Sequence, residues 1–114
     1  GASAGGLEAL SGFIKSLPEN PNAAFIVAQH LAPHAKSMMV ELLGRQTKLK
    51  IISVKDHLEL RPGLVCVVPP NYDVTTHDGE LRLTKAGEQT RPKPSVDAFF
   101  QSLAKVYGRR AVGI

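Results

Sequence analysis

A serine in a glycine-rich turn opens the sequence. Gly1-Ala2-Ser3-Ala4-Gly5 fits the pattern G-x-S-x-G, in which small neighbours let the chain turn sharply from a strand into a helix and expose the serine oxygen. A helix starting just after Ser3 would offer free backbone N–H groups to a tetrahedral oxyanion, and those of Ala4 and Gly5 are the candidate donors. Taken alone, the motif fits equally well a tight turn or a phosphate-binding loop.

A serine hydroxyl is a weak nucleophile at neutral pH, so this chemistry also needs a base, usually a histidine. The sequence contains four histidines, and His30 is the best placed because it ends the next apolar run, residues 23–28. The C-terminal ends of parallel strands share one edge of a sheet, where active sites collect. We therefore expect Ser3 and His30 to lie together at that edge as nucleophile and general base.

The remaining titratable residues give weaker signals. His34, His57 and His77 stand in loop-like surroundings without HExxH or Cys/His spacing, so we expect surface residues and no metal site. An acid that orients the imidazole is not evident. The carboxylates considered for it are Asp56, Asp73, Asp78 and Asp97, of which Asp78 fits a turn and Asp97 the first turn of a helix.

The elements that would position these residues alternate between helix and strand. Apolar residues at helical spacing predict a helix over 7–17, closed by Pro18. A second helix is predicted around 38–43, with Ser37 as N-cap and Gly44 near its end. Continuous apolar runs over 23–28 and 64–68 are typical of strands buried in a parallel sheet. A further strand is predicted over 50–54, where the sequence alternates or is apolar through Ile51 and Ile52.

The second half of the sequence begins with a hairpin pattern. Residues 72–76 and 80–84 flank Asp78-Gly79, a strong hairpin turn, and we expect this hairpin at the edge of the sheet. A third helix is predicted over 96–107, opened by Ser95 and stopped by Gly108, and a strand over 111–114. The pattern predicts an α/β fold: a three-layer sandwich with a mostly parallel sheet plus one antiparallel hairpin. Because the chain opens on a turn and stops within an apolar run, we expect a domain truncated at both ends.

Composition narrows the class of protein. The chain has 114 residues, 43% of them hydrophobic, which suits one globular domain without a membrane span. Its net charge of +4 permits an acidic partner, but the basic residues are dispersed and aromatic residues are only 5%, so nucleic-acid binding is not favoured. The single cysteine, Cys66, lies among valines and is predicted to be a core residue. We expect a cytoplasmic protein.

Several blocks, in the same order, resemble the methylesterase domain of bacterial chemotaxis proteins, especially the type fused to the receptor methyltransferase. The blocks are GASAGGLEAL, QHLAPHAKS, RPGLVCVVPPN and RPKPSVDAFFQSLAKVYGRRAVGI. The resemblance spans nearly all of residues 1–114. It implies that Ser3 is the nucleophile and His30 its base, and that the third triad member is an aspartate beyond residue 114. Ala4 stands where members linked to a response regulator usually have threonine.

The resemblance also implies the reaction and the partners. The reaction is hydrolysis of glutamate γ-methyl esters on the cytoplasmic helices of methyl-accepting chemoreceptors during adaptation, within a phosphorelay, and some relatives deamidate glutamines. No cofactor is implied, and a methyltransferase or regulatory domain is an expected fusion partner. The fragment alone is expected to be inactive, since it lacks the acid. Two alternatives stay open: a nucleotide-binding α/β module and a non-catalytic signalling domain.

Overall fold

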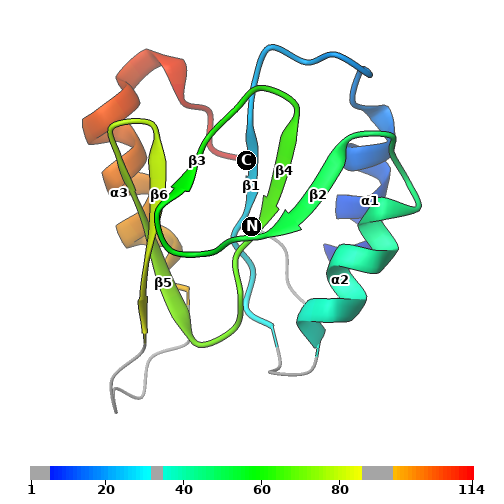
Figure 1. Cartoon of the computed structure of the whole chain (residues 1–114), viewed down its shortest axis with the longest axis horizontal. Helices are drawn as coiled ribbons and strands as arrows, with labels where there is room; N and C mark the ends of the chain where they lie inside the picture. The colour runs from blue at the N-terminus through cyan, green and yellow to red at the C-terminus, as the bar shows by residue number, and fades with distance from the viewer. Residues whose placement is uncertain (1–5, 32–34, 86–93) are drawn as a thin grey trace.

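The computed structural model describes residues 6–31, 35–85 and 94–114. At its centre lies a parallel sheet of three strands in the order β1-β4-β2 (Figure 1). The strands are β1 (Phe25–Val27), β2 (Lys50–Ser53) and β4 (Leu64–Val67). Their registers bring Val27, Val67 and Ser53 side by side at the carboxyl end of the sheet. The three apolar runs of the sequence therefore form the parallel strands that their patterns predict.

Two helices pack on one side of this sheet (Figure 1). Helix α1 (Gly6–Ser16) confirms the first predicted helix, and α2 (Ala35–Gly44) ends at the predicted glycine. The expectation that Ser37 caps α2 was wrong, because the helix begins at Ala35 and Ser37 lies inside its first turn. Alanine and lysine are good helix formers, so the helix extends upstream of the apolar residues that signalled it.

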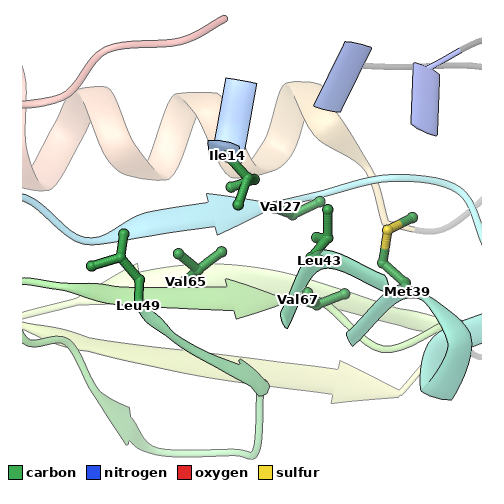
Figure 2. Close-up of a cluster of buried hydrophobic side chains, with 7 residues drawn as sticks. All are labelled: Ile14, Val27, Met39, Leu43, Leu49, Val65 and Val67. Atoms are coloured by element: carbon green, nitrogen blue, oxygen red, sulfur yellow. The ribbon is translucent and has the colours of Figure 1, made fainter. Parts of the chain in front are cut away.

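The first core lies between these helices and the sheet (Figure 2). Val65 and Val67 of β4 point toward the helices, whereas Cys66 and Val68 belong to the core on the opposite face. All four are fully buried, as expected for a strand covered on both faces. The buried members of the first core are Ile14, Val27, Met39, Leu43, Leu49, Val65 and Val67.

The hairpin belongs to a second sheet. Strands β5 (Tyr72–His77) and β6 (Glu80–Lys85) pair antiparallel, and the short strand β3 (Leu58–Glu59) pairs with the other edge of β6. Asp78 and Gly79 form the predicted two-residue turn, both with positive φ, 41° and 84°, which is the geometry of a type I′ hairpin. The expectation that the hairpin lies at the edge of the parallel sheet was wrong, because the hairpin and β3 form a separate sheet. Strand β3 was not predicted, because two residues are too few to show a strand pattern.

Helix α3 (Val96–Tyr107) packs on β5 and supplies Phe99 to the second core, which joins the two sheets. Ser95 is its N-cap, as predicted, and Gly108 its C-cap with φ 51°. The buried members of the second core are Val54, Cys66, Val68, Val74, Leu81 and Phe99. These features confirm the predicted α/β class with a parallel sheet and an antiparallel hairpin.

The predicted strand over 111–114 was wrong within the described structure. A short 3₁₀ helix, η1 (Gly108–Arg110), follows α3, and residues 111–114 then adopt no regular structure. Val112 and Ile114 are 81% and 78% exposed, so these apolar side chains are not buried as a central strand requires. In the described parts of the chain, no helix has the length and apolar character needed to cross a membrane.

Candidate functional site

His30 lies just beyond the carboxyl end of β1, where the parallel strands finish together. The ladder continues one residue past the strands, since Val68 N–H donates to the carbonyl of Val27 at 3.0 Å and Val54 N–H to that of Val67 at 2.9 Å. The His30 residue is exposed. The structure thus places His30 at the edge of the sheet that its sequence position predicts, accessible to a reacting partner.

The imidazole of His30 contacts a backbone carbonyl distant in sequence. Its Nε2 lies 3.1 Å from the carbonyl oxygen of Pro94, in a partly buried position. Pro94 is fully buried and stands directly before the N-cap of α3. The start of α3 and the end of β1 therefore meet at this contact, although His30 and Pro94 are 64 positions apart in the sequence.

A carboxylate anchors the other side of the same peptide group. Ser95 N–H donates to Asp73 Oδ1 at 2.7 Å, and the Ser95 hydroxyl accepts from Ala98 N–H at 3.4 Å. Asp73 is the second residue of β5, which begins soon after the chain leaves β4. The sequence offered Asp73 only as a weak candidate for an orienting acid, and its placement against α3 depends on a contact between residues 22 positions apart.

Two buried polar oxygens lie near the same edge of the sheet. Gln29 directly precedes His30 in the sequence, and Ser53 is the last residue of β2. Neither Gln29 Oε1 nor Ser53 Oγ has a hydrogen-bond partner within the described parts of the chain. A buried acceptor without a partner costs about 1–3 kcal/mol. Sequence patterns could not single these residues out, since burial and lack of a partner are properties of the folded chain.

The other predicted site residues divide into two groups. Ser3, Ala4, Gly5 and His34 lie outside the described residues. Helix α1 begins at Gly6, the residue that follows the serine motif. His57 and His77 are exposed, as predicted for surface residues. Thus the structure gives the position of the predicted base, and the predicted nucleophile with its oxyanion donors stays a prediction.

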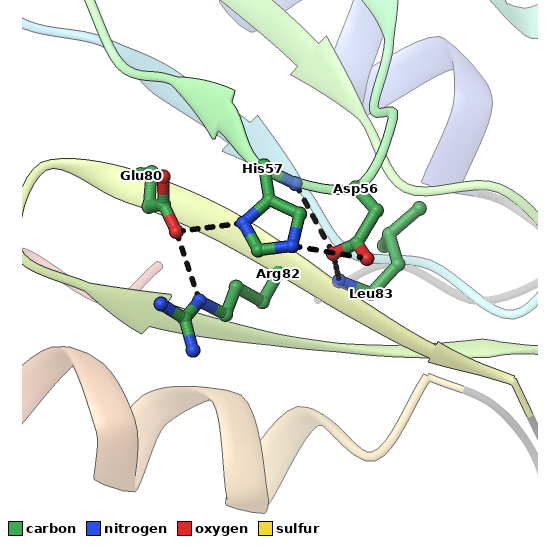
Figure 3. A network of polar contacts seen from close by, with 5 residues as sticks. All are labelled: Asp56, His57, Glu80, Arg82 and Leu83. Atoms are coloured by element: carbon green, nitrogen blue, oxygen red, sulfur yellow. Dashed lines mark hydrogen bonds and ion pairs between the residues drawn. The ribbon is translucent and has the colours of Figure 1, made fainter.

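His57 is nevertheless part of a polar network on the antiparallel sheet (Figure 3). Its Nδ1 donates to Glu80 Oε1 at 3.0 Å, and Arg82 Nε donates to the same oxygen at 2.8 Å. These bonds from Arg82 and His57 lower the pKa of Glu80. The Leu83 N–H, which donates to Asp56 Oδ1 at 2.9 Å, is the main cause of the lowered pKa of Asp56. This network links β6 to the turn before β3. Asp56 therefore has a structural role at this turn, and it lies far from His30 along the sequence.

The remaining candidates have the structural roles that the sequence predicts. Asp78 lies in the hairpin turn and Asp97 in the first turn of α3. Cys66 is fully buried, and burial raises the pKa of its thiol to about 11, which is typical of an unreactive core cysteine. In the described parts of the chain, no group of three or more histidine, cysteine or acidic residues could hold a metal ion.

The comparison with known proteins gives one consistent result. A family model for CheB methylesterase matches residues 1–114. The chain belongs to the CheB methylesterase family. The chain is 33% identical over 118 residues to protein-glutamate methylesterase/protein-glutamine glutaminase 3 of Geobacter sulfurreducens, and 32% identical over 114 residues to protein-glutamate methylesterase/protein-glutamine glutaminase 2 of Anaeromyxobacter dehalogenans. Both matches cover all of this chain, but only 32% and 33% of those proteins.

The CheB fold is also found among solved structures. The crystal structure of the Thermotoga maritima CheB methylesterase catalytic domain matches with a TM-score of 0.77 and 26% identity, over 90% of this chain and 57% of that one. A relative from Leptospira interrogans is 26% identical, and the chain spans 60% of its length. The chain thus spans at most about three fifths of the length of these relatives.

Proposed function

We propose that this chain carries the nucleophile and the general base of a protein-glutamate methylesterase. The observation that carries the proposal is the position of His30 at the carboxyl end of β1, in a chain whose whole length matches the CheB methylesterase family. Helix α1 begins at Gly6, immediately after the G-x-S-x-G motif. A nucleophile on such a turn and a histidine at the end of a parallel strand are the arrangement that serine hydrolases of α/β fold use.

The proposed reaction is an acyl transfer in two steps. Ser3 Oγ attacks the carbonyl carbon of a glutamate γ-methyl ester while His30 takes the hydroxyl proton, and backbone N–H groups of Ala4 and Gly5 stabilise the oxyanion. His30 returns the proton to the leaving methoxide, which departs as methanol. Water then attacks the acyl-serine with His30 again as base, and the products are glutamate and free Ser3. No cofactor takes part.

We further propose that the substrates are methylated chemoreceptor helices in the cytoplasm, in adaptation controlled by a phosphorelay. The relatives carry names that join methylesterase with protein-glutamine glutaminase, and the same acyl chemistry would release ammonia from a glutamine side chain. The net charge of +4 favours docking on acidic receptor helices. A comparison of hydrolysis rates on methylated and on amidated receptor shows whether methanol or ammonia is released faster.

The catalytic unit extends beyond this chain in our proposal. The relatives are longer, and the triad acid is proposed to be an aspartate beyond residue 114, so residues 1–114 form a partial catalytic domain. We therefore expect the isolated fragment to hydrolyse no ester, and the tests below use the complete protein that contains this sequence.

Serine labelling tests the proposal directly. The complete protein is treated with a fluorophosphonate probe, which forms a covalent bond only with an activated serine, and wild type is compared with Ser3→Ala and His30→Gln. We expect labelling of wild type that disappears in both variants, and release of methanol from methylated receptor by wild type only. His77→Gln is the matched control, because His77 is an exposed histidine at the end of a strand of the other sheet. Labelling that survives Ser3→Ala would refute the assignment of the nucleophile.

A further inference from the structure

The contact between His30 and Pro94 determines which nitrogen of the neutral imidazole carries the proton. A carbonyl oxygen can only accept a hydrogen bond, so His30 Nε2, 3.1 Å from Pro94 O, must be the donor. A neutral imidazole carries one proton, and its other nitrogen is then an acceptor. In a neutral His30 held in this contact, the proton is therefore on Nε2 and the lone pair on Nδ1, the nitrogen that can receive a proton from a nucleophile.

The carbonyl that selects this tautomer is itself held in place. Pro94 C=O and Ser95 N–H belong to one planar peptide group, so neither can rotate without the other. Asp73 Oδ1 accepts from Ser95 N–H at 2.7 Å, a short bond to a charged acceptor, and such bonds are about twice as strong as neutral ones. The buried ring of Pro94 and the capping bond from Ala98 N–H to Ser95 Oγ restrict the same segment further.

We propose that Asp73 is a positioning residue for His30 and acts through the Pro94–Ser95 peptide group. Its carboxylate fixes the orientation of this group. By binding the Ser95 N–H, it also polarises the Pro94 carbonyl, which accepts the hydrogen bond from His30 Nε2–H. The consequence is a preformed base whose Nδ1 is the proton acceptor. The inference rests on the proposed function in one respect only, namely that His30 is the base for Ser3.

This arrangement also limits how an acid beyond residue 114 can contribute. A carboxylate that approaches Nε2 shares the proton with Pro94 O and leaves the tautomer unchanged. A carboxylate that bonds Nδ1–H instead requires the opposite tautomer and displaces the contact with Pro94. The tautomer of His30 in the complete protein therefore decides between the two arrangements.

The first test reads the tautomer by nuclear magnetic resonance. In the complete protein labelled with ¹⁵N in its imidazoles, two-bond ¹H–¹⁵N correlations distinguish a protonated Nε2 from a protonated Nδ1, and the spectrum of His30→Gln assigns the signal. We expect the Nε2–H form in wild type and a mixture of tautomers in Asp73→Ala. Asp73→Asn keeps an oxygen at Oδ1 and should restore the Nε2–H form.

Asp56→Ala is the matched control. Asp56 also accepts from a backbone N–H, that of Leu83 at 2.9 Å, but it lies in the network of the antiparallel sheet. Its removal should leave the His30 tautomer unchanged, whereas a general loosening of the fold would affect both variants alike. Nδ1–H in wild type, or an unchanged tautomer in Asp73→Ala, would overturn the proposal.

The second test measures the rate of labelling by the fluorophosphonate probe. Loss of one hydrogen bond that orients the base should slow Asp73→Ala about three- to tenfold, and Asp73→Asn should recover to within about twofold. An unchanged rate in Asp73→Ala would refute the positioning role while the esterase proposal stands. Absence of labelling in wild type with the Nε2–H form intact would instead refute the proposed function, and with it any role of the contact in catalysis.

Discussion

Ile14 packs α1 onto the parallel sheet, and its replacement should loosen the helix that follows the serine motif. Its side chain is fully buried in the core that also contains Val27 and Leu43 (Figure 2). Ile14→Ala removes three carbon atoms at about 0.8 kcal/mol each, or about 2.4 kcal/mol. The cavity left behind brings the expected loss of stability to about 3 kcal/mol. Ile14→Val removes one carbon and should cost about 1 kcal/mol.

Hydrogen exchange, followed by mass spectrometry on peptides from α1 in the complete protein, measures this loss locally. A loss of about 3 kcal/mol corresponds to roughly a hundredfold decrease in protection, and about 1 kcal/mol to roughly fivefold. The matched control is Lys15→Ala, since Lys15 is the next residue of the helix and is exposed; its effect should stay within about 0.5 kcal/mol. Equal protection in Ile14→Ala and Lys15→Ala would refute the view that burial of Ile14 holds α1 on the sheet.

Three further predictions concern the cap of α3, the buried thiol and the polar network. Ser95→Ala should destabilise α3 by about 1 kcal/mol, measured as faster exchange in its first turn, while Ser95→Asp should retain the cap; equal losses in the two variants would contradict the capping role. Cys66, whose pKa burial raises to about 11, should resist iodoacetamide in the folded protein and react after denaturation; alkylation under native conditions would count against its burial. The lowered pKa values of Asp56 and Glu80 mean that their stabilising effect is complete above their ordinary values of 3.8 and 4.5, and is lost as the pH falls through the lower folded values. Protection of β6, corrected for intrinsic exchange, should therefore fall below about pH 3.8, and constant protection in acid would show that the network contributes nothing.

Local patterns were sufficient for most of the elements. Spacing of Leu7, Leu10 and Ile14 predicted α1, because burial of one helix face imposes a period on the sequence. Apolar runs predicted β1, β2 and β4, because burial of a strand on both faces favours consecutive apolar residues. The Asp78-Gly79 turn and the Ser95 cap were also predictable, since each depends on the conformational preferences of the residues concerned. Besides the Ser37 cap of α2, the failures were β3, the separate sheet of the hairpin, and the strand expected over 111–114. These three depend on which strands find partners.

The site divides in the same way between sequence and tertiary structure. The sequence by itself determined that a serine motif precedes a helix and that a histidine ends a buried strand, because both statements concern neighbours along the chain. Only the tertiary structure placed the Pro94 carbonyl on His30 and Asp73 behind it, through contacts that span 64 and 22 positions. Hydrogen bonds between distant segments leave no period or spacing in the sequence. The groups proposed to orient the base could therefore be identified only in the folded chain, where the end of β1 meets the starts of β5 and α3.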